Sequence, residues 1–413
     1  MNIRRIIGAF VALFAITVSA VAQKPNEVAL SFARGRHRQE ITIPQIAGYN
    51  VYKADFHTHT IYSDGTITPS WRVREAWFDG LDIIAITDHI EYRRVERELL
   101  KYMDKYIKEE YRGLAKGVNT NLQGSAADEL GILSNLNVGY ESAKECNEQY
   151  GLLIVRGVEI TRNEGHFNAI FTKDNNKIYH PDIEQSIANA VKQGAFVFQN
   201  HPKHDKTTSS SMTPLAERMH EKGLVKGIEL CNGPVMWSRL ISYCLDNGYT
   251  PIANSDGHTT MAERYYPHYN NGCYRNMTLI LAKECTEKAI KQALNEGRTI
   301  AYHNNKLIGK EEYLSELFKN SVSIEHMCDN KKETMVILTN KSSFPYQLKF
   351  GKRTAVVEGM GAVQLTLPKG AREVEFVVTN LICGNGKRPK VAMNFERKPT
   401  NKYLEDNPTW YPY

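Results

Sequence analysis

The sequence predicts an α/β protein with a closed or distorted barrel, followed by a small all-β domain of the sandwich type. Two patterns lead to this prediction. Between residues 51 and 305, short apolar runs typical of buried strands alternate with helical segments in roughly seven units, which favours a barrel over an open sheet. From residue 331 onward, short β-type runs follow one another, with Asn, Gly and Pro turns between them.

The first 22 residues have the features of a signal peptide. Arg4 and Arg5 precede an apolar run over residues 6–18, and an Ala-x-Ala cleavage motif follows at 20–22. This run is too short for a typical membrane span, and no cysteine stands at the cleavage site. The alternative is a buried or membrane helix. We expect a mature chain without a membrane anchor, located in the periplasm or secreted.

The overall composition excludes several classes of protein. Hydrophobic residues make up 42% of the 413 residues, enough for a sizeable core. The net charge of +6 is mild and no continuous Lys/Arg run occurs, so no nucleic acid polymer is expected as a partner. The 7 cysteines are an odd number without a CxxC pair, which argues against a disulfide framework. The oligomeric state stays open.

The barrel strands are predicted where apolar runs are bounded by polar loops, because strands of a parallel sheet are buried on both faces. In such barrels the chemistry lies in the loops that follow the C-terminal ends of the strands. The strands are expected at 51–56, 82–86, 152–158, 166–171, 195–198, 226–230, 251–253 and 276–281, and the helices at 69–78, 183–192, 215–222, 239–246 and 284–296.

Four further segments complete the predicted organisation. Residues 23–50 are a polar lead-in, and residues 91–150 interrupt the barrel pattern as an insertion. This insertion begins with a charged helix over 91–111, and it either caps the active site or is a solvated excursion. Residues 306–330 are expected to form a connecting helix, and residues 331–413 a small β domain and tail without an acid cluster. The β-type runs of this domain are 333–339, 346–350, 354–357, 362–367 and 373–379.

Residues that typically bind metal ions recur at the ends of the predicted strands. His57 and His59 are separated by one residue on an extended chain, so both imidazoles can reach one ion. Structural histidines would not follow strand ends in this way; only His166 is placed at the start of a strand. The donors are too many for one ion and suit two or three, with one bridging carboxylate. They are His57, His59, Asp64, His89, Glu159, His166, His201, Asp256 and His258.

These motifs resemble those of the PHP (polymerase and histidinol phosphatase) family of metal-dependent phosphoesterases. The matching pieces are His57-Thr58-His59-Thr60, Ser63-Asp64-Gly65, Thr87-Asp88-His89, Gly157-Val158-Glu159, His166, Asn200-His201-Pro202 and Asp256-Gly257-His258. They span residues 54–258, and the barrel is expected to run to about 305. The resemblance implies a distorted (β/α)₇ barrel and a site for three metal ions.

The resemblance also implies how the donors divide among the ions. Glu159 would be the bridge between two of them. The long insertion between His89 and Glu159, and the short distance in sequence from Glu159 to His166, depart from the family pattern and leave the shape of the substrate pocket open. The implied sets are His57, His59, Glu159 and Asp256; Glu159, His166 and His201; and Asp64, His89 and His258.

This set of residues predicts hydrolysis of a small phosphomonoester or phosphodiester by a metal-activated water. The ions are expected to be Zn, Mn or Fe, and Glu159, Asp256 and His201 are expected at the catalytic step. Asp88 is expected to orient a ligand histidine or to support a loop. The substrate is expected to contact some of the following residues: Arg93, Lys203, His204, Glu229, Asn232, Arg264 and Arg275.

Two other functions are compatible with the sequence. Similar His-rich barrels hydrolyse C–N or C–O bonds, which a carboxylated or bridging lysine on a central strand would favour; no clear candidate occurs. The second alternative is a glycan- or partner-binding protein whose barrel serves only as a scaffold. The complete set of donors argues against this second alternative.

Overall fold

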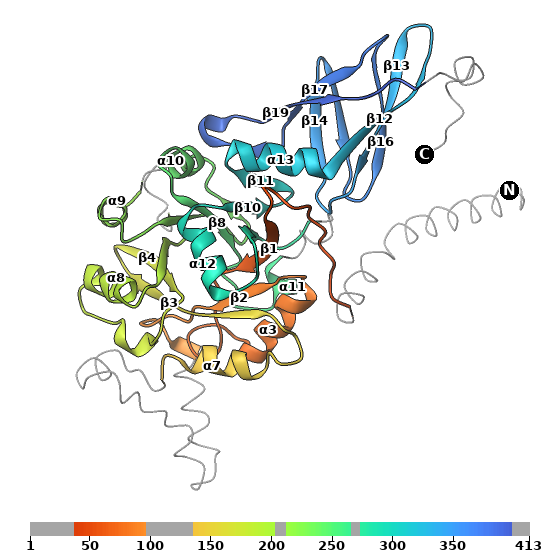
Figure 1. The fold of residues 1–413 in the computed structure, drawn as a ribbon. Coiled ribbons are helices and arrows are strands. Elements are labelled where there is room, and N and C mark those ends of the chain that lie inside the picture. Colours follow the sequence, from red (N-terminus) through yellow and green to blue (C-terminus); the bar gives the residue numbers. More distant parts are fainter. Residues whose placement is uncertain (1–36, 96–134, 203–211, 266–272, 399–413) are drawn as a thin grey trace, which may run out of the picture.

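The computed structural model describes residues 37–95, 135–202, 212–265 and 273–398. Figure 1 shows a curled sheet with helices on its outer side, and a second group of strands at one end of the molecule. The predicted α/β class with additional C-terminal β strands is therefore confirmed. Among the described helices, none is long and apolar enough to cross a membrane.

The main sheet is mixed rather than parallel. Its order is β18-β11-β10-β9-β1-β2-β3-β4-β5-β6-β7, with β8 paired to β6, and β18 is the short strand Leu381–Ile382. The neighbours β1 to β3 are parallel, as are β5, β6 and β8, but β4 is antiparallel to both β3 and β5. The bounds are Asn50–Asp55 (β1), Ile83–Ile86 (β2), Leu153–Arg162 (β3), Gly165–Ile170 (β4), Phe196–Gln199 (β5), Gly227–Asn232 (β6), Val235–Met236 (β7), Thr250–Asn254 (β8), Met277–Ala282 (β9), Thr299–His303 (β10) and Lys306–Gly309 (β11).

The antiparallel pairings of β4 with β3 and β5, and of β9 with β1 and β10, correct the prediction of a parallel sheet or barrel. Only residues 163–164 separate β3 from β4, and so short a link allows a hairpin but not a helical crossover. The sheet then curls until β8 approaches β1 and β9. An isolated bridge joins Thr58 to Gly257, and the Ala253 amide donates to the Thr278 hydroxyl over 3.0 Å. The count of seven β/α units stays a prediction.

The helices begin where the sequence places capping residues. The Thr68 hydroxyl accepts from the Trp71 amide, so the helix starts at Pro69, and Asp182 caps the next predicted helix in the same way. The helix predicted from 284 begins at Glu287, because Thr286 is its cap. The helix bounds are Pro69–Phe78 (α3), Val138–Glu145 (α7), Ile183–Lys192 (α8), Pro214–Glu221 (α9), Leu240–Asp246 (α10), Met261–Arg264 (α11), Glu287–Asn295 (α12) and Glu311–Ser321 (α13).

Part of the predicted insertion packs on the barrel. Helix α7 contacts α3, β2 and β3. The approach is close, because a Cβ atom on Gly139 would lie 2.5 Å from an oxygen of Asp88. Residues 96–134, which include most of the predicted charged helix, lie outside the described residues.

The C-terminal strands form two sheets. One contains β12 (Val322–Asp329), β13 (Glu333–Asn340) and β16 (Ala362–Pro368). The other contains β15 (Arg353–Val357), β14 (Tyr346–Phe350), β17 (Glu373–Val378) and β19 (Lys390–Asn394). The predicted connecting helix over 306–330 is shorter than expected, because α13 occupies only its centre between β11 and β12.

The β domain and the barrel share a continuous apolar core. Phe318 of α13 packs against Tyr346 and Phe376, with ring centroids 5.1 and 6.2 Å apart. Strand β18 (Leu381–Ile382) also joins the barrel sheet by pairing in parallel with β11. The two parts therefore support each other, and the C-terminal strands help to hold the barrel that carries the candidate site.

Candidate metal centre

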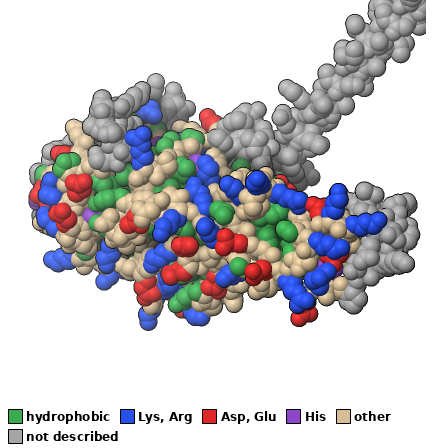
Figure 2. Space-filling model, turned by 90° about the horizontal axis from the view of Figure 1, so that it is seen from above, with side chains coloured by type: hydrophobic (Ala, Val, Ile, Leu, Met, Phe, Trp, Pro, Cys, Tyr) green, Lys and Arg blue, Asp and Glu red, His purple; other side chains and the backbone are tan. Residues whose placement is uncertain are grey.

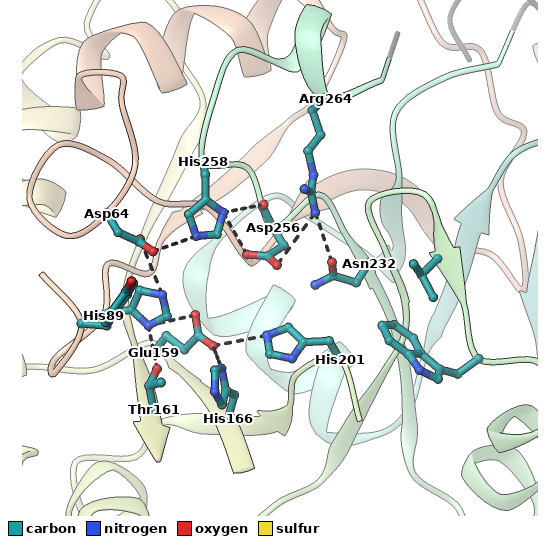
Figure 3. A pocket seen from close by; sticks show the side chains of 13 residues that line it. Asp64, His89, Glu159, Thr161, His166, His201, Asn232, Asp256, His258 and Arg264 are labelled. Carbon is teal, nitrogen blue, oxygen red and sulfur yellow. Dashed lines mark hydrogen bonds and ion pairs between the residues drawn. The ribbon is translucent and has the colours of Figure 1, made fainter. Parts of the chain in front are cut away.

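The nine predicted metal donors meet at one rim of the curled sheet. Figure 3 labels all of them except His57 and His59. His57 and His59 follow β1, His89 follows β2, and His201 follows β5. Asp256 and His258 follow β8, and Asp64 lies in the loop after β1. The rule that chemistry lies beyond the C-terminal strand ends thus places most of the site.

Glu159 is an exception to that rule. It lies inside β3, opposite Asn168 of β4, rather than at a strand end as predicted. Strand β3 continues to Arg162 because it leaves its parallel neighbour and pairs with β4. His166, the second residue of β4, lies across the same hairpin, and its Nδ1 is 2.9 Å from Glu159 Oε1. The hairpin brings both side chains to the same centre.

The donor atoms form three overlapping groups, and within each group the atoms lie within 4.8 Å of one another. Two of the groups contain the same residues that the family resemblance implies. In the third group, His59 joins the three implied residues. The groups are His57, His59, Glu159 and Asp256; Glu159, His166 and His201; and His59, Asp64, His89 and His258.

Glu159 stands at the middle of this arrangement. Its Oε2 is 3.0 Å from His57 Nε2 and 3.2 Å from His59 Nε2, while Oε1 faces His166 and lies 3.5 Å from His201 Nε2. Its side chain is only 1% exposed. One carboxylate therefore presents an oxygen to each of two donor groups, as a bridging ligand would.

The third group, which contains Asp64, His89 and His258, is closer to solvent than the first group around His57. Asp64 Oδ2 is 3.2 Å from His258 Nε2, and Asp64 Oδ1 is 3.6 Å from His89 Nε2. The side chain of His258 is 33% exposed. The Thr161 hydroxyl lies 2.6 Å from His89 Nδ1 and so orients the imidazole ring, whose Nε2 faces Asp64.

Carboxylates raise the pKa of the two innermost histidines. Burial alone lowers the pKa of His57, but Asp256, Glu229 and Glu159 surround it and raise that pKa well above its usual value. Burial also opposes protonation of His59, yet its hydrogen bonds to Asp256 and Glu159 raise the pKa to about 9. The electrostatic field at the centre thus favours positive charge.

The carboxylates themselves remain ionised. Burial raises the pKa of Glu159, but the charge of protonated His57 and the hydrogen bonds with His166 and His201 outweigh it and hold that pKa well below the usual range. The pKa of Asp256 is likewise held well below its usual range, mainly by His57 against the effect of burial. Burial lowers the pKa of His89 to about 3, so this ring is neutral and offers a lone pair.

These residues fit divalent metal ions. The donors are imidazole nitrogens and carboxylate oxygens, which suit zinc, manganese and iron. Nδ1 of His59 is buried and has no hydrogen-bond partner within the described part of the chain. The carboxylate field that favours protonated His57 and His59 would equally favour a bound cation.

Glu229 is a hub beneath the metal donors and not a pocket residue. This corrects the prediction that it lines the substrate pocket, because it is completely buried. Its Oε1 lies 3.0 Å from His57 Nδ1 and accepts from Asn254 Nδ2 over 2.9 Å. Its Oε2 accepts from the His201 amide at 2.7 Å and from Asn232 Nδ2 at 2.9 Å. Glu229 therefore orients donors on two different loops.

Arg72 of α3 ties the loops after β1 and β8 together. Its guanidinium donates to the carbonyl oxygens of His59 (2.9 Å) and Gly257 (2.6 Å). Glu75 pairs with this guanidinium at 3.0 Å and also accepts from the Met261 amide at 2.9 Å. Sequence reasoning missed Arg72, because an Arg three residues before a Glu on a helix is the ordinary pattern of a surface pair.

Other predicted residues have structural roles. The Asp88 carboxylate accepts from the amide of Thr60 and the hydroxyl of Ser63, so it supports the loop that carries Asp64 instead of orienting a ligand histidine. Arg93 and Arg275 are buried and do not line the pocket, which corrects their prediction as substrate contacts. Arg93 donates to the His89 carbonyl, and Arg275 pairs with Asp55 and Asp79. Lys203 and His204 lie outside the described residues.

A pocket of about 590 Å³ opens above the donors. Arg264 and Asn232, two of the expected substrate contacts, line it, and the guanidinium Nη2 lies 3.3 Å from Asn232 Oδ1 and 3.9 Å from Asp256 Oδ2. Figure 3 shows Arg264 pointing toward Asp256 and Asn232 at one side of the centre. Arg264 is the only Lys or Arg among the pocket residues that the structure describes.

The comparisons with known proteins agree with this centre. A family model described as the PHP domain matches residues 55–325. A solved structure from Bacteroides vulgatus, a two-domain protein containing a predicted PHP-like metal-dependent phosphoesterase, is 31% identical with a TM-score of 0.74. The match covers 87% of this chain and 99% of that one. An uncharacterised protein of Methanocaldococcus jannaschii is 40% identical over 63 residues, which span 13% of this chain and 29% of that protein.

Proposed function

The chain belongs to the PHP domain family, and on this premise we propose that it hydrolyses a small phosphomonoester or phosphodiester with two or three divalent metal ions. The family resemblance inferred from the motifs is thereby confirmed. The observation that carries the proposal is the set of three donor groups around the buried Glu159. A single carboxylate shared by two donor groups is typical of centres that act on phosphoryl groups with paired ions.

Each part of the centre has a place in the proposed reaction. The residues of the three groups would hold the ions, with Glu159, Asp256 and His201 nearest the reacting atoms. When bound, such ions supply Lewis acidity toward phosphoryl oxygens and lower the pKa of water. Arg264 offers N–H donors at the edge of the centre, where they would bind a phosphoryl oxygen and stabilise its charge.

The pocket favours a small substrate over a nucleic acid polymer. Its volume of about 590 Å³ suits a small ligand. On the face seen in Figure 2, Lys and Arg side chains are interspersed with Asp and Glu instead of forming one continuous basic surface. A polymer backbone would need a line of cations beyond Arg264. No lysine lines the described part of the pocket, so nothing specific favours hydrolysis of C–N bonds.

The proposal includes where the protein works and which metals it uses. Zinc, manganese or iron would suit the mixture of imidazole and carboxylate ligands. The N-terminal segment with the features of a signal peptide supports a periplasmic or secreted location.

Elemental analysis combined with two model substrates tests the proposal. We expect two or three metal ions per chain, and chelator-sensitive hydrolysis of p-nitrophenyl phosphate or bis-p-nitrophenyl phosphate. The preferred compound would separate a monoesterase from a diesterase. Bound metal without cleavage of either compound would favour the C–N hydrolase. A chain that binds no metal after incubation with manganese or zinc would contradict the proposal and favour a binding protein.

A further inference from the structure

One wall of the pocket combines a cation with apolar side chains. This wall, which we call the hairpin wall, consists of Asn232, Val235, Trp237 and Arg264. The first three residues belong to the β6–β7 hairpin or directly follow it. Asn232 and Val235 are direct partners in the antiparallel ladder, so they stand side by side. The hairpin wall thus extends from the metal donors toward solvent on a regular backbone.

The turn of the hairpin brings the cation and the apolar residues into one surface. Gly233 has φ +49°, and a Cβ atom there would lie 2.5 Å from Arg264 Nη2 and 2.9 Å from its Cζ. The guanidinium therefore lies directly on the turn. The Arg264 Nε donates to the Ser255 carbonyl over 3.0 Å, which anchors the side chain next to the loop of Asp256. The cationic end of the hairpin wall is therefore fixed beside the metal donors.

The apolar end of the hairpin wall is anchored through its backbone and is partly open to solvent. The Trp237 amide donates to the Leu230 carbonyl over 2.9 Å, and its ring packs partly on the apolar core beneath the hairpin. Val235 is 46% exposed. The described part of the chain has five exposed large hydrophobic residues, and two of them, Val235 and Tyr92, line this pocket. A ligand that covers this apolar surface would gain free energy from its burial.

We propose that the natural substrate is a phosphoester whose alcohol carries a flat apolar group, such as an aromatic ring, and that Trp237 and Val235 bind this group. The inference rests on the proposed function, because it places the phosphoryl group at the metal donors and Arg264. From there the esterified group extends along the hairpin wall. A rigid tryptophan binds a flat ring through a large contact area at low entropic cost.

Two phosphate monoesters with similar leaving groups test the inference. Benzyl phosphate and ethyl phosphate both release primary alcohols, so their difference reports mainly on contacts to the ring. With the metal-loaded chain, we expect KM for benzyl phosphate to be roughly tenfold below that for ethyl phosphate. Trp237→Ala should remove this advantage and leave KM for ethyl phosphate within about twofold.

Two further variants separate recognition from folding. Trp237→Phe keeps an aromatic ring and should retain most of the preference. Trp71→Ala makes the same change at a residue of α3 that is 42% exposed and does not line the pocket, so it should alter neither substrate. An unchanged preference in Trp237→Ala, or an equal loss for both substrates in a variant that melts like the parent, would contradict the inference.

Binding of phosphonates distinguishes this inference from the proposed function. Benzylphosphonate and methylphosphonate cannot be hydrolysed at an ester bond, and calorimetry measures their affinities for the metal-loaded chain directly. Tighter binding of the benzyl compound, lost in Trp237→Ala, would support the hairpin wall even if neither ester were cleaved. Equal affinities of the parent chain for both compounds would overturn the inference, even if p-nitrophenyl phosphate were hydrolysed.

Discussion

The inner and outer parts of the metal centre are built from the same kinds of side chain but are held differently. In the inner group, made of His57, His59, Glu159 and Asp256, no side chain is more than 15% exposed, and Glu229 contacts the far side of the His57 ring. The outer group around Asp64 and His258 is partly open, with one third of the His258 side chain exposed. The inner donors are therefore better shielded from water than the outer group is at His258. We expect an ion to be bound more tightly at the inner group.

Loss of the shared carboxylate should have the largest effect. In Glu159→Gln the oxygen charge common to two donor groups disappears. We expect at least one ion fewer per chain by elemental analysis and a fall in kcat/KM of roughly a thousandfold or more. A variant with the parent's metal content and activity would show that Glu159 does not bridge.

Loss of the hub beneath the inner group should have the second largest effect. In Glu229→Gln the amide NH₂ replaces one carboxylate oxygen and must face the two groups that point at it, either His57 and Asn254 or the His201 amide and Asn232. We expect metal affinity to fall roughly 10- to 100-fold, measured by competition with a chromogenic chelator.

Glu141→Gln is a matched control for this variant, because Glu141 lies on α7 with its side chain 53% exposed. It should leave metal affinity unchanged. Melting of both proteins without metal separates a loss of folding from a loss of orientation. Equal metal affinity in Glu229→Gln and the parent would mean that the hub does not position the donors.

A change at the outer group should have a smaller effect. Asp64→Asn removes the only carboxylate of the outer group, in which the other donors are histidines. We expect the loss of one ion, while the inner ions and most of the ligand-dependent rise in melting temperature are retained. Stepwise chelation of the parent should release that same ion first. If Asp64→Asn lost all its metal, the two parts would not be independent.

A histidine outside the three donor groups serves as a control for the comparison of inner and outer donors, and its replacement should not affect metal binding. His220 of α9 is buried, and burial lowers its pKa to about 4, although its Nδ1 lies 3.0 Å from the Val225 carbonyl. The folded state thus favours the neutral ring, and the unfolded chain binds more protons below pH about 6.5. The free energy of unfolding should therefore fall as the pH drops from about 6.5 to about 4, by an amount on the order of 3 kcal/mol.

Chemical denaturation at several pH values measures this loss. His220→Gln should weaken the dependence on pH in that range and leave the metal content unchanged. If the variant kept the full dependence on pH, burial of His220 would not be its source.

Much of the fold and most of the candidate donors could be predicted from short stretches of sequence. The helices at 69–78 and 183–192 have the predicted bounds, because Thr68 and Asp182 cap them and the apolar faces are local patterns. Donors such as His57, His89 and His201 follow their own strands by two or three residues. A motif of this kind needs no knowledge of the remaining chain.

Contacts between distant segments decided the rest. Whether a buried Glu lines a pocket or orients a histidine depends on its neighbours, and Glu229 lies 172 residues from His57 in the sequence. Arg72 likewise joins two loops that are far apart in the sequence. The curl of the sheet brings β8 beside β1, and the loops after these two strands are linked by an isolated bridge and not by a ladder. The sequence by itself thus determined which side chains can bind metal ions, because ligand chemistry belongs to each residue. Only the tertiary structure decided how they are grouped and held, because distances between strands depend on the closure of the whole sheet.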